Sequence, residues 1–230
     1  MALIAPSLLG ADLTRLGEVL HQWEEQGVRM VHVDVTDGHC VPDITVGQPV
    51  IQNLRKATDL VLDIHLLVER PERYALQFVE CGADRVAIPA ESTPNLHQAL
   101  SEIRSHGVLA GLAVNPSTAI DSVKEAVEDA DYLLILTADP GLKSAAFIPR
   151  TVQKVVAAAA LCRERGLGFE IEVEGGIGLD QVEKLREAGA DILVADSDIF
   201  GNDVPRNRLG DMIRLAGLAE KSSSGLQRKT

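Results

Sequence analysis

The sequence predicts an α/β fold, a single (β/α)8 TIM barrel, and two observations along its 230 residues support that prediction. The first is a strict alternation of amphipathic segments with short apolar runs rich in Val, Leu, Ile and Ala. Strands that alternate with helices form parallel sheets with right-handed crossovers. The second is the length, which accommodates eight such units of roughly 25 to 30 residues each. No Gly-x-Gly-x-x-Gly pattern follows the first apolar run, which disfavours an open dinucleotide-binding sheet.

Eight apolar runs are the expected strands, and a glycine stands before five of them. Glycine just past a helix end is the usual C-terminal cap, so these glycines predict helix-to-strand junctions; they are Gly27, Gly82, Gly107, Gly166 and Gly189. Helices are expected between the strands, for example over 13–26, 71–80, 93–105 and 148–165. The expected strands are residues 3–5, 28–35, 60–65, 85–88, 108–114, 132–136, 169–173 and 192–195.

The end of the chain differs in composition from the rest. Residues 219–230 contain Ser222-Ser-Ser-Gly225 and three Lys or Arg side chains. We therefore expect residues 1–218 to form one barrel domain and residues 219–230 to be a polar, disordered tail.

Composition and charge exclude several classes of partner. The net charge of −12 argues against nucleic acid and against an anionic membrane surface. The three cysteines form no Cys-x-x-Cys pair, so no disulfide framework is indicated. No basic leader opens the sequence, and no segment approaches the ~20 apolar residues of a membrane span. We expect a cytoplasmic protein.

Polar residues stand at the end of most of the expected strands. In a (β/α)8 barrel, catalytic and binding residues lie where strands end and the following loops begin. The sequence therefore predicts an active site at that face of the barrel. The residues are Ser7, His32, Asp34, His65, Asn115, Thr137, Glu174 and Asp196.

Four of these side chains have the chemistry of a metal centre. Two imidazoles (His32 and His65) and two carboxylates (Asp34 and Glu174) suit a divalent ion such as Zn²⁺, and Fe²⁺, Mn²⁺ or Co²⁺ are alternatives. A lone strand histidine is more often a core residue than a ligand, but four such residues at strand ends favour the metal site. A metal there would act as a Lewis acid on a sugar carbonyl, and the carboxylates could move the proton next to it.

Several motifs make the chain similar to one known family over about residues 3–217. The run His32-Val-Asp-Val-Thr-Asp-Gly-His-Cys-Val-Pro42 resembles the first signature of the ribulose-phosphate 3-epimerase family, and Leu62-Asp-Ile-His-Leu66 resembles the second. Further similar segments are residues 4–12, 115–118, 147–149 and 199–201.

The resemblance implies a barrel of the ribulose-phosphate-binding type and an isomerase of carbohydrate metabolism in the pentose phosphate series. It implies a divalent metal held by His32, Asp34, His65 and Glu174. It also implies epimerisation through an enediolate, in which Asp34 and Glu174 are the two bases. Ser7 and His65 would bind a sugar or sugar phosphate, and the protein would be a homo-oligomer.

Departures from the family pattern lie in the site itself. Glu174 stands where the family has aspartate. The family binds its phosphate with glycine-rich loops, which correspond here to Gly141, Gly175, Gly176, Asp196 and Ser197. A glycine has become Asp196, and a carboxylate ~4–5 Å from a phosphate costs roughly 3–4 kcal/mol. We therefore predict an altered phosphate site and leave open an altered substrate.

Two other functions are weighed against the epimerase. One is a non-catalytic, metal-binding relative with a binding or regulatory role, which the departures at the site would suit. The other is a lyase that uses a Schiff-base lysine. It is disfavoured because no lysine lies at an inward strand end; Lys143 lies in a loop.

Overall fold

The structure, a computed structural model, describes residues 1–141, 145–200 and 208–217, apart from the side chain of Ser197. Eight parallel strands lie in the order β1-β8-β7-β6-β5-β4-β3-β2, and a bridge between Ser7 and His32 joins the two ends of this series. The predicted (β/α)8 barrel is confirmed. The strands are β1 Leu3–Pro6, β2 Met30–Thr36, β3 Val61–Leu67, β4 Arg85–Pro89, β5 Leu109–Val114, β6 Tyr132–Leu136, β7 Glu170–Glu174 and β8 Ile192–Ala195.

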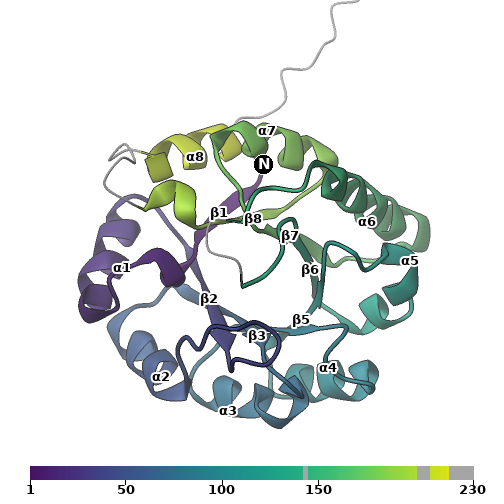
Figure 1. The fold of residues 1–230 in the computed structure, drawn as a ribbon, viewed down its shortest axis with the longest axis horizontal. Coiled ribbons are helices and arrows are strands. Elements are labelled where there is room, and N and C mark those ends of the chain that lie inside the picture. The colour runs from purple at the N-terminus through teal and green to yellow at the C-terminus, as the bar shows by residue number, and fades with distance from the viewer. Residues whose placement is uncertain (142–144, 201–207, 218–230) are drawn as a thin grey trace, which may run out of the picture.

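Helices surround the strands as an outer ring (Figure 1). Several begin later than the sequence predicts, because their first residues form a separate 3-10 turn. Residues Leu13–Arg15 are one such turn, in which the Asp12 carboxylate accepts a hydrogen bond from the Thr14 N–H at 2.9 Å. The helices are α1 Leu16–Glu25, α2 Gln48–Ala57, α3 Ala75–Glu80, α4 Leu96–Ser105, α5 Ile120–Val123, α6 Val152–Arg165, α7 Leu179–Ala188 and α8 Arg208–Gly217.

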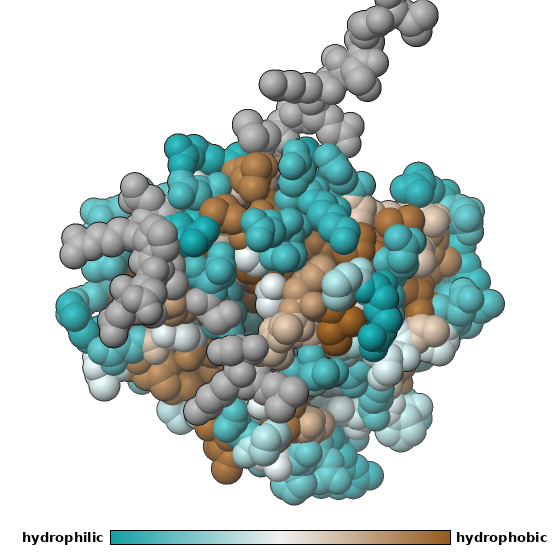
Figure 2. Space-filling view, turned by 45° about the horizontal axis from the view of Figure 1, so that its top comes forward, coloured by the Kyte–Doolittle hydropathy of each residue, from teal (hydrophilic) through white to brown (hydrophobic). Residues whose placement is uncertain are grey.

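Glycines end two of these helices as the sequence predicts. Gly166 follows α6 with φ +66° and Gly189 follows α7 with φ +108°, conformations that favour glycine. Each turn directs the chain towards the next strand. The tail predicted for residues 219–230 lies outside the described residues. No helix in the described part of the chain is long and apolar enough to cross a membrane. In Figure 2, hydrophilic residues spread over the visible face with apolar patches between them.

Alternation along the strands separates two environments. Val31 and Val33 of β2 belong to the large apolar cluster that includes helix residues such as Leu20 and Ile51. His32, between the two valines, instead contacts charged side chains from β3 and β7. Since successive strand side chains point to opposite faces, the barrel interior receives the residues that the sequence marks as polar.

Candidate metal centre and active site

Side chains from β2, β3 and β7 converge inside the barrel. His32, Asp34, His65 and Glu174 each offer a ligand atom, and these atoms all lie within 4.8 Å of one another. The register that pairs Asp34 with His65 brings two of them together. His65 Nδ1 is 3.0 Å from Asp34 Oδ1 and 3.1 Å from Glu174 Oε2. His32 Nε2 is 3.4 Å from Asp34 Oδ1 and 3.5 Å from Glu174 Oε2. The predicted four-residue cluster therefore exists as a compact group.

Burial differs among the four residues. The side chains of His32 and His65 are fully buried, that of Asp34 is 5% exposed and that of Glu174 is 17% exposed. Glu174 is thus the member most open to solvent. The extra methylene of Glu174, relative to the aspartate of the family pattern, does not take its carboxylate away from the histidines.

The chemistry of the cluster fits a divalent cation. Two nitrogens and two carboxylates form a donor set that zinc and similar ions accept. His32 Nε2 and His65 Nε2 are buried without a hydrogen-bond partner among the residues that the structure describes. An unpartnered buried nitrogen is costly, and a bound cation at the cluster would satisfy His32 Nε2.

The pKa shifts of the cluster residues also favour a positive charge at this site. Burial lowers the pKa of His65, but hydrogen bonds with Asp34 and Glu174 outweigh it and raise that pKa to about 9. Burial raises the pKa of Asp34, and the opposing attraction of His32 and His65 brings it below its usual value. The carboxylates of the cluster therefore stabilise a cation between them, either protons on the imidazoles or a metal.

A second layer of charged residues lies directly below the cluster. Asp63 Oδ2 is 2.6 Å from His32 Nδ1, and Glu172 Oε1 is 3.3 Å from the same nitrogen. Burial and the charge of Asp63 raise the pKa of Glu172 to about 7. Arg85 lies between these carboxylates. This layer was not predicted from the sequence, although Asp63 and Glu172 each stand two residues before a predicted ligand and so share its strand face.

These pKa values predict how the stability of the metal-free protein depends on pH. The pKa of His65 rises from 6.5 to about 9 on folding. Its contribution to stability is therefore complete below pH 6.5 and is lost as pH rises through about 9. The pKa of Glu172 rises from 4.5 to about 7 on folding, so its contribution to stability is also lost as pH rises between those values. The pKa values of Asp34 and Asp63 are lowered from 3.8 on folding, so their contribution to stability is lost as pH falls below that value.

We expect the free energy of unfolding of the metal-free protein to be largest near about pH 5 and to fall on both sides, by on the order of 5 kcal/mol towards about pH 9, with His65 and Glu172 each contributing about half of that loss. Urea unfolding of the chelated protein across this range measures the profile. A free energy of unfolding that stays constant or rises between about pH 5 and about pH 9 would contradict the assignment.

The predicted substrate-binding residues lie around the same end of the barrel, and their roles remain predictions. Ser7 is buried at the end of β1, and its hydroxyl accepts a hydrogen bond from the Leu9 N–H at 3.3 Å. Gly141 has φ +75° and packs against Val41 of the loop after β2. Asp196 is exposed at the beginning of a short 3-10 helix. The side chain of Ser197 lies outside the described part of the structure.

Gly175 and Gly176 allow two loops to approach closely. Their φ values are +110° and +64°. A Cβ on Gly175 would lie 2.7 Å from the Ala138 nitrogen, and one on Gly176 would lie 2.6 Å from the Phe147 nitrogen. The loop after β7 is therefore packed directly on the loop after β6, with space for glycine only.

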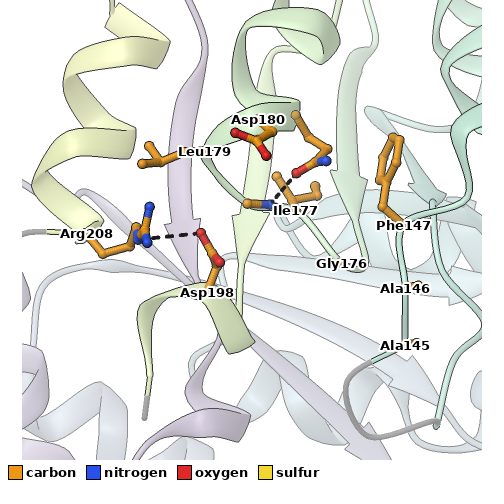
Figure 3. Close-up of a pocket in the computed structure, with 11 residues that line it drawn as sticks. Ala145, Ala146, Phe147, Gly176, Ile177, Leu179, Asp180, Asp198 and Arg208 are labelled. Atoms are coloured by element: carbon orange, nitrogen blue, oxygen red, sulfur yellow. Dashed lines mark hydrogen bonds and ion pairs between the residues drawn. The ribbon is translucent and has the colours of Figure 1, made fainter. Parts of the chain in front are cut away.

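A pocket of about 320 Å³ opens next to Gly176. Asp198 and Arg208 face each other on one side of it, with Asp198 Oδ2 3.8 Å from Arg208 Nε, and Phe147 lies on the other side (Figure 3). Asp198 also approaches Gly178, where an added Cβ would lie 3.0 Å from the carboxylate. Neither charged residue was predicted from the sequence to have a role. Sequence spacing could not pair them, because they come from different elements.

Comparison with known proteins gives this site its context. A model of the ribulose-phosphate 3 epimerase family matches residues 3–200, which contain all four residues of the cluster. This chain belongs to the ribulose-phosphate 3-epimerase family. The family resemblance predicted from the motifs is confirmed.

Several proteins named as epimerases of this family are similar over most of their length. The ribulose-phosphate 3-epimerase of Bacillus subtilis is 36% identical over 213 residues, which cover 92% of this chain and 98% of that protein. The Synechocystis ribulose-phosphate 3-epimerase is 40% identical over 199 residues, 86% of each chain. The chloroplastic ribulose-5-phosphate-3-epimerase of Arabidopsis thaliana is 39% identical over 86% of this chain and 72% of its own.

Solved structures extend the similarity of fold beyond this family. A 3-hexulose-6-phosphate synthase aligns with a TM-score of 0.66 at 17% identity, covering 94% of this chain and 99% of its own. KGPDC from Streptococcus mutans aligns with a TM-score of 0.69 at 13% identity, covering 94% of this chain and 97% of its own. At these identities the comparison shows a shared barrel and nothing about the reaction.

Proposed function

We propose that this protein is a metal-dependent epimerase that inverts the carbon next to the ketone of a ketose phosphate, with ribulose 5-phosphate as its first candidate substrate. The observation that supports this most strongly is the convergence of His32, Asp34, His65 and Glu174 within 4.8 Å in a member of the epimerase family. The protein is thus an isomerase that acts on carbohydrates.

The four residues of the cluster would hold the divalent ion. When bound, such an ion stabilises negative charge that develops on a ketone oxygen. His32 and His65 would contribute neutral imidazole nitrogens from fully buried positions, Asp34 would contribute a nearly buried carboxylate, and Glu174 would contribute the carboxylate most open to solvent. Which of Zn²⁺, Fe²⁺, Mn²⁺ or Co²⁺ the protein uses remains open.

Inversion of a carbon requires two proton-transfer groups. The proton must leave from one face of the carbon and a proton must return to the other face. We assign these transfers to Asp34 on β2 and Glu174 on β7, which come from strands on different sides of the barrel (Figure 1). In either direction, one carboxylate removes the proton from C3 and the other protonates the enediolate, so the two exchange roles between the forward and reverse reactions.

Placement of the substrate's far end is proposed from the neighbouring loops. Gly175 and Gly176 follow Glu174 directly, and backbone N–H groups of such turns are suited to bind a phosphate. Asp198 beside Gly178 adds a negative charge on the same side, which disfavours an anion near it and which Arg208, with its Nε 3.8 Å from Asp198 Oδ2, offsets in part. We therefore include an unphosphorylated ketose as the alternative substrate. The oligomeric state stays a prediction.

Deuterium exchange tests the function directly. Protein that has been chelated and reloaded with each of the four metals is incubated in D₂O with ribulose 5-phosphate and, separately, with ribulose. We expect metal-dependent loss of the C3 proton signal and appearance of the C3 epimer, with the phosphorylated sugar reacting faster. Tight metal binding without exchange on either sugar would favour the non-catalytic alternative.

A further inference from the structure

A buried arginine lies beneath the candidate metal centre. The Arg85 side chain, on β4, is only 3% exposed, and its guanidinium meets carboxylates of two other strands. Its Nε is 3.3 Å from Asp63 Oδ1 on β3, and one terminal nitrogen is 3.0 Å from Glu172 Oε2 on β7. The other terminal nitrogen donates a hydrogen bond to Glu170 Oε2. A planar guanidinium fixes the spacing of the carboxylates that it binds, which a flexible ammonium does not.

Asp63 connects this arginine to the cluster. Its Oδ1 accepts hydrogen bonds from Arg85 Nε and from the Tyr132 hydroxyl at 2.9 Å. Its Oδ2 lies 2.6 Å from His32 Nδ1. A carboxylate on Nδ1 favours the tautomer with a proton there, and this leaves the lone pair of His32 Nε2 directed at the cluster.

The barrel provides space for this arrangement. Tyr132 is completely buried, and the Arg85 guanidinium lies 3.9 Å from the centre of its ring. Gly111 on β5 is the register partner of Tyr132 on β6, and a Cβ on Gly111 would lie 2.2 Å from the tyrosine ring. A side chain at Gly111 would therefore displace the tyrosine that completes the hydrogen bonds of Asp63. The six consecutive strands β2 to β7 therefore all contribute to this arrangement, β5 through Gly111.

We propose that Arg85 is a positioning residue for metal binding: it holds Asp63 in place, and Asp63 in turn orients His32. This inference rests on the proposed function because it takes His32 as a ligand. Arg85 does not contact the metal or the substrate. Its substitution should change the orientation of the His32 ring while Asp34, His65 and Glu174 keep their positions.

The test compares Zn²⁺ affinity and the His32 Nδ1–H resonance in Zn²⁺-loaded protein. We expect Arg85→Met to raise the Zn²⁺ dissociation constant by about 10- to 100-fold and to shift or broaden that resonance. Arg85→Lys keeps the charge without the planar fork and should show a smaller change in the same direction, as should Tyr132→Phe, which removes one hydrogen bond to Asp63. These two variants carry the test if Arg85→Met does not fold.

Arg104→Met is the matched control. Arg104 Nε lies 3.3 Å from Asp131 Oδ1, the same distance as in the Arg85–Asp63 pair, but on the outside of the barrel. Its Zn²⁺ affinity should be that of the wild type. Folded Arg85→Lys and Tyr132→Phe variants with wild-type affinity and an unchanged resonance would overturn the proposal, as would an equal loss in the control.

The experiment separates this inference from the proposed function. Neither readout uses a sugar. Loss of Zn²⁺ affinity in the Arg85 variants of a protein that epimerises no ketose would reject the function and retain the positioning role.

Discussion

Asp34→Asn should lower kcat/KM for epimerisation by about 10³-fold or more, because it removes one of the two proposed bases. Asp34 is nearly completely buried and faces His32 and His65, and Glu174 is the other carboxylate of the four-residue cluster among the described residues. The amide retains an oxygen that can approach a metal but cannot accept a proton at neutral pH. The loss of rate should therefore exceed the loss of metal affinity.

Steady-state rates and metal titration of the same preparation measure the two effects. Asp121→Asn is the control, since Asp121 is an exposed acid on α5 far along the chain from the cluster. It should leave both quantities unchanged. Retention of more than about a tenth of the wild-type rate in Asp34→Asn would exclude Asp34 as a base.

The fold and the four-residue cluster could be predicted because their signals are local. Each strand is a short apolar run, and a histidine or carboxylate within such a run is conspicuous. The glycines at helix ends mark the junctions, as Gly166 and Gly189 show. Given a parallel barrel, the ends of its strands necessarily meet on one face. These steps need no knowledge of which residues pair.

The layer below the cluster could not be predicted because it depends on strand register. Arg85 meets Asp63 because β3 and β4 pair these two residues, and it meets Glu172 from a strand 87 positions away. An arginine at the beginning of an apolar run carries no local sign of those partners. The 3-10 turns before α1 and α6 were not predicted either. The Asp12 side chain caps the first, whereas the second begins at Pro149 and has no side-chain cap, so the two turns share no sequence signal.

Glu174 is where this chain differs from the family at a proposed base, and its backbone is firmly held. The Thr137 N–H donates to the Glu174 carbonyl at 2.6 Å, and the Thr137 hydroxyl donates to the carbonyls of Glu174 and Gly175 at 2.8 and 2.6 Å. The register also pairs Glu174 with Leu136. The end of β7 therefore has little freedom to move inward if the side chain at this position is shortened.

Glu174→Asp should consequently lower kcat/KM by about 10²-fold, although aspartate is the residue that the family pattern has here. Removing one methylene withdraws the carboxylate by more than about an ångström from its contacts with His65 and His32, and misplacements of that size typically cost this much. Glu174→Gln should lose more, about 10³-fold, because the amide keeps the reach but is not a base. Stopped-flow or deuterium-exchange rates, with metal affinity measured in parallel, give both values.

Glu183→Asp, on the exposed face of α7, makes the same chemical change away from the site and should leave the rate unaltered. A Glu174→Asp variant as fast as the wild type would mean that β7 does adjust, and that the contacts of Thr137 do not fix the position of this base.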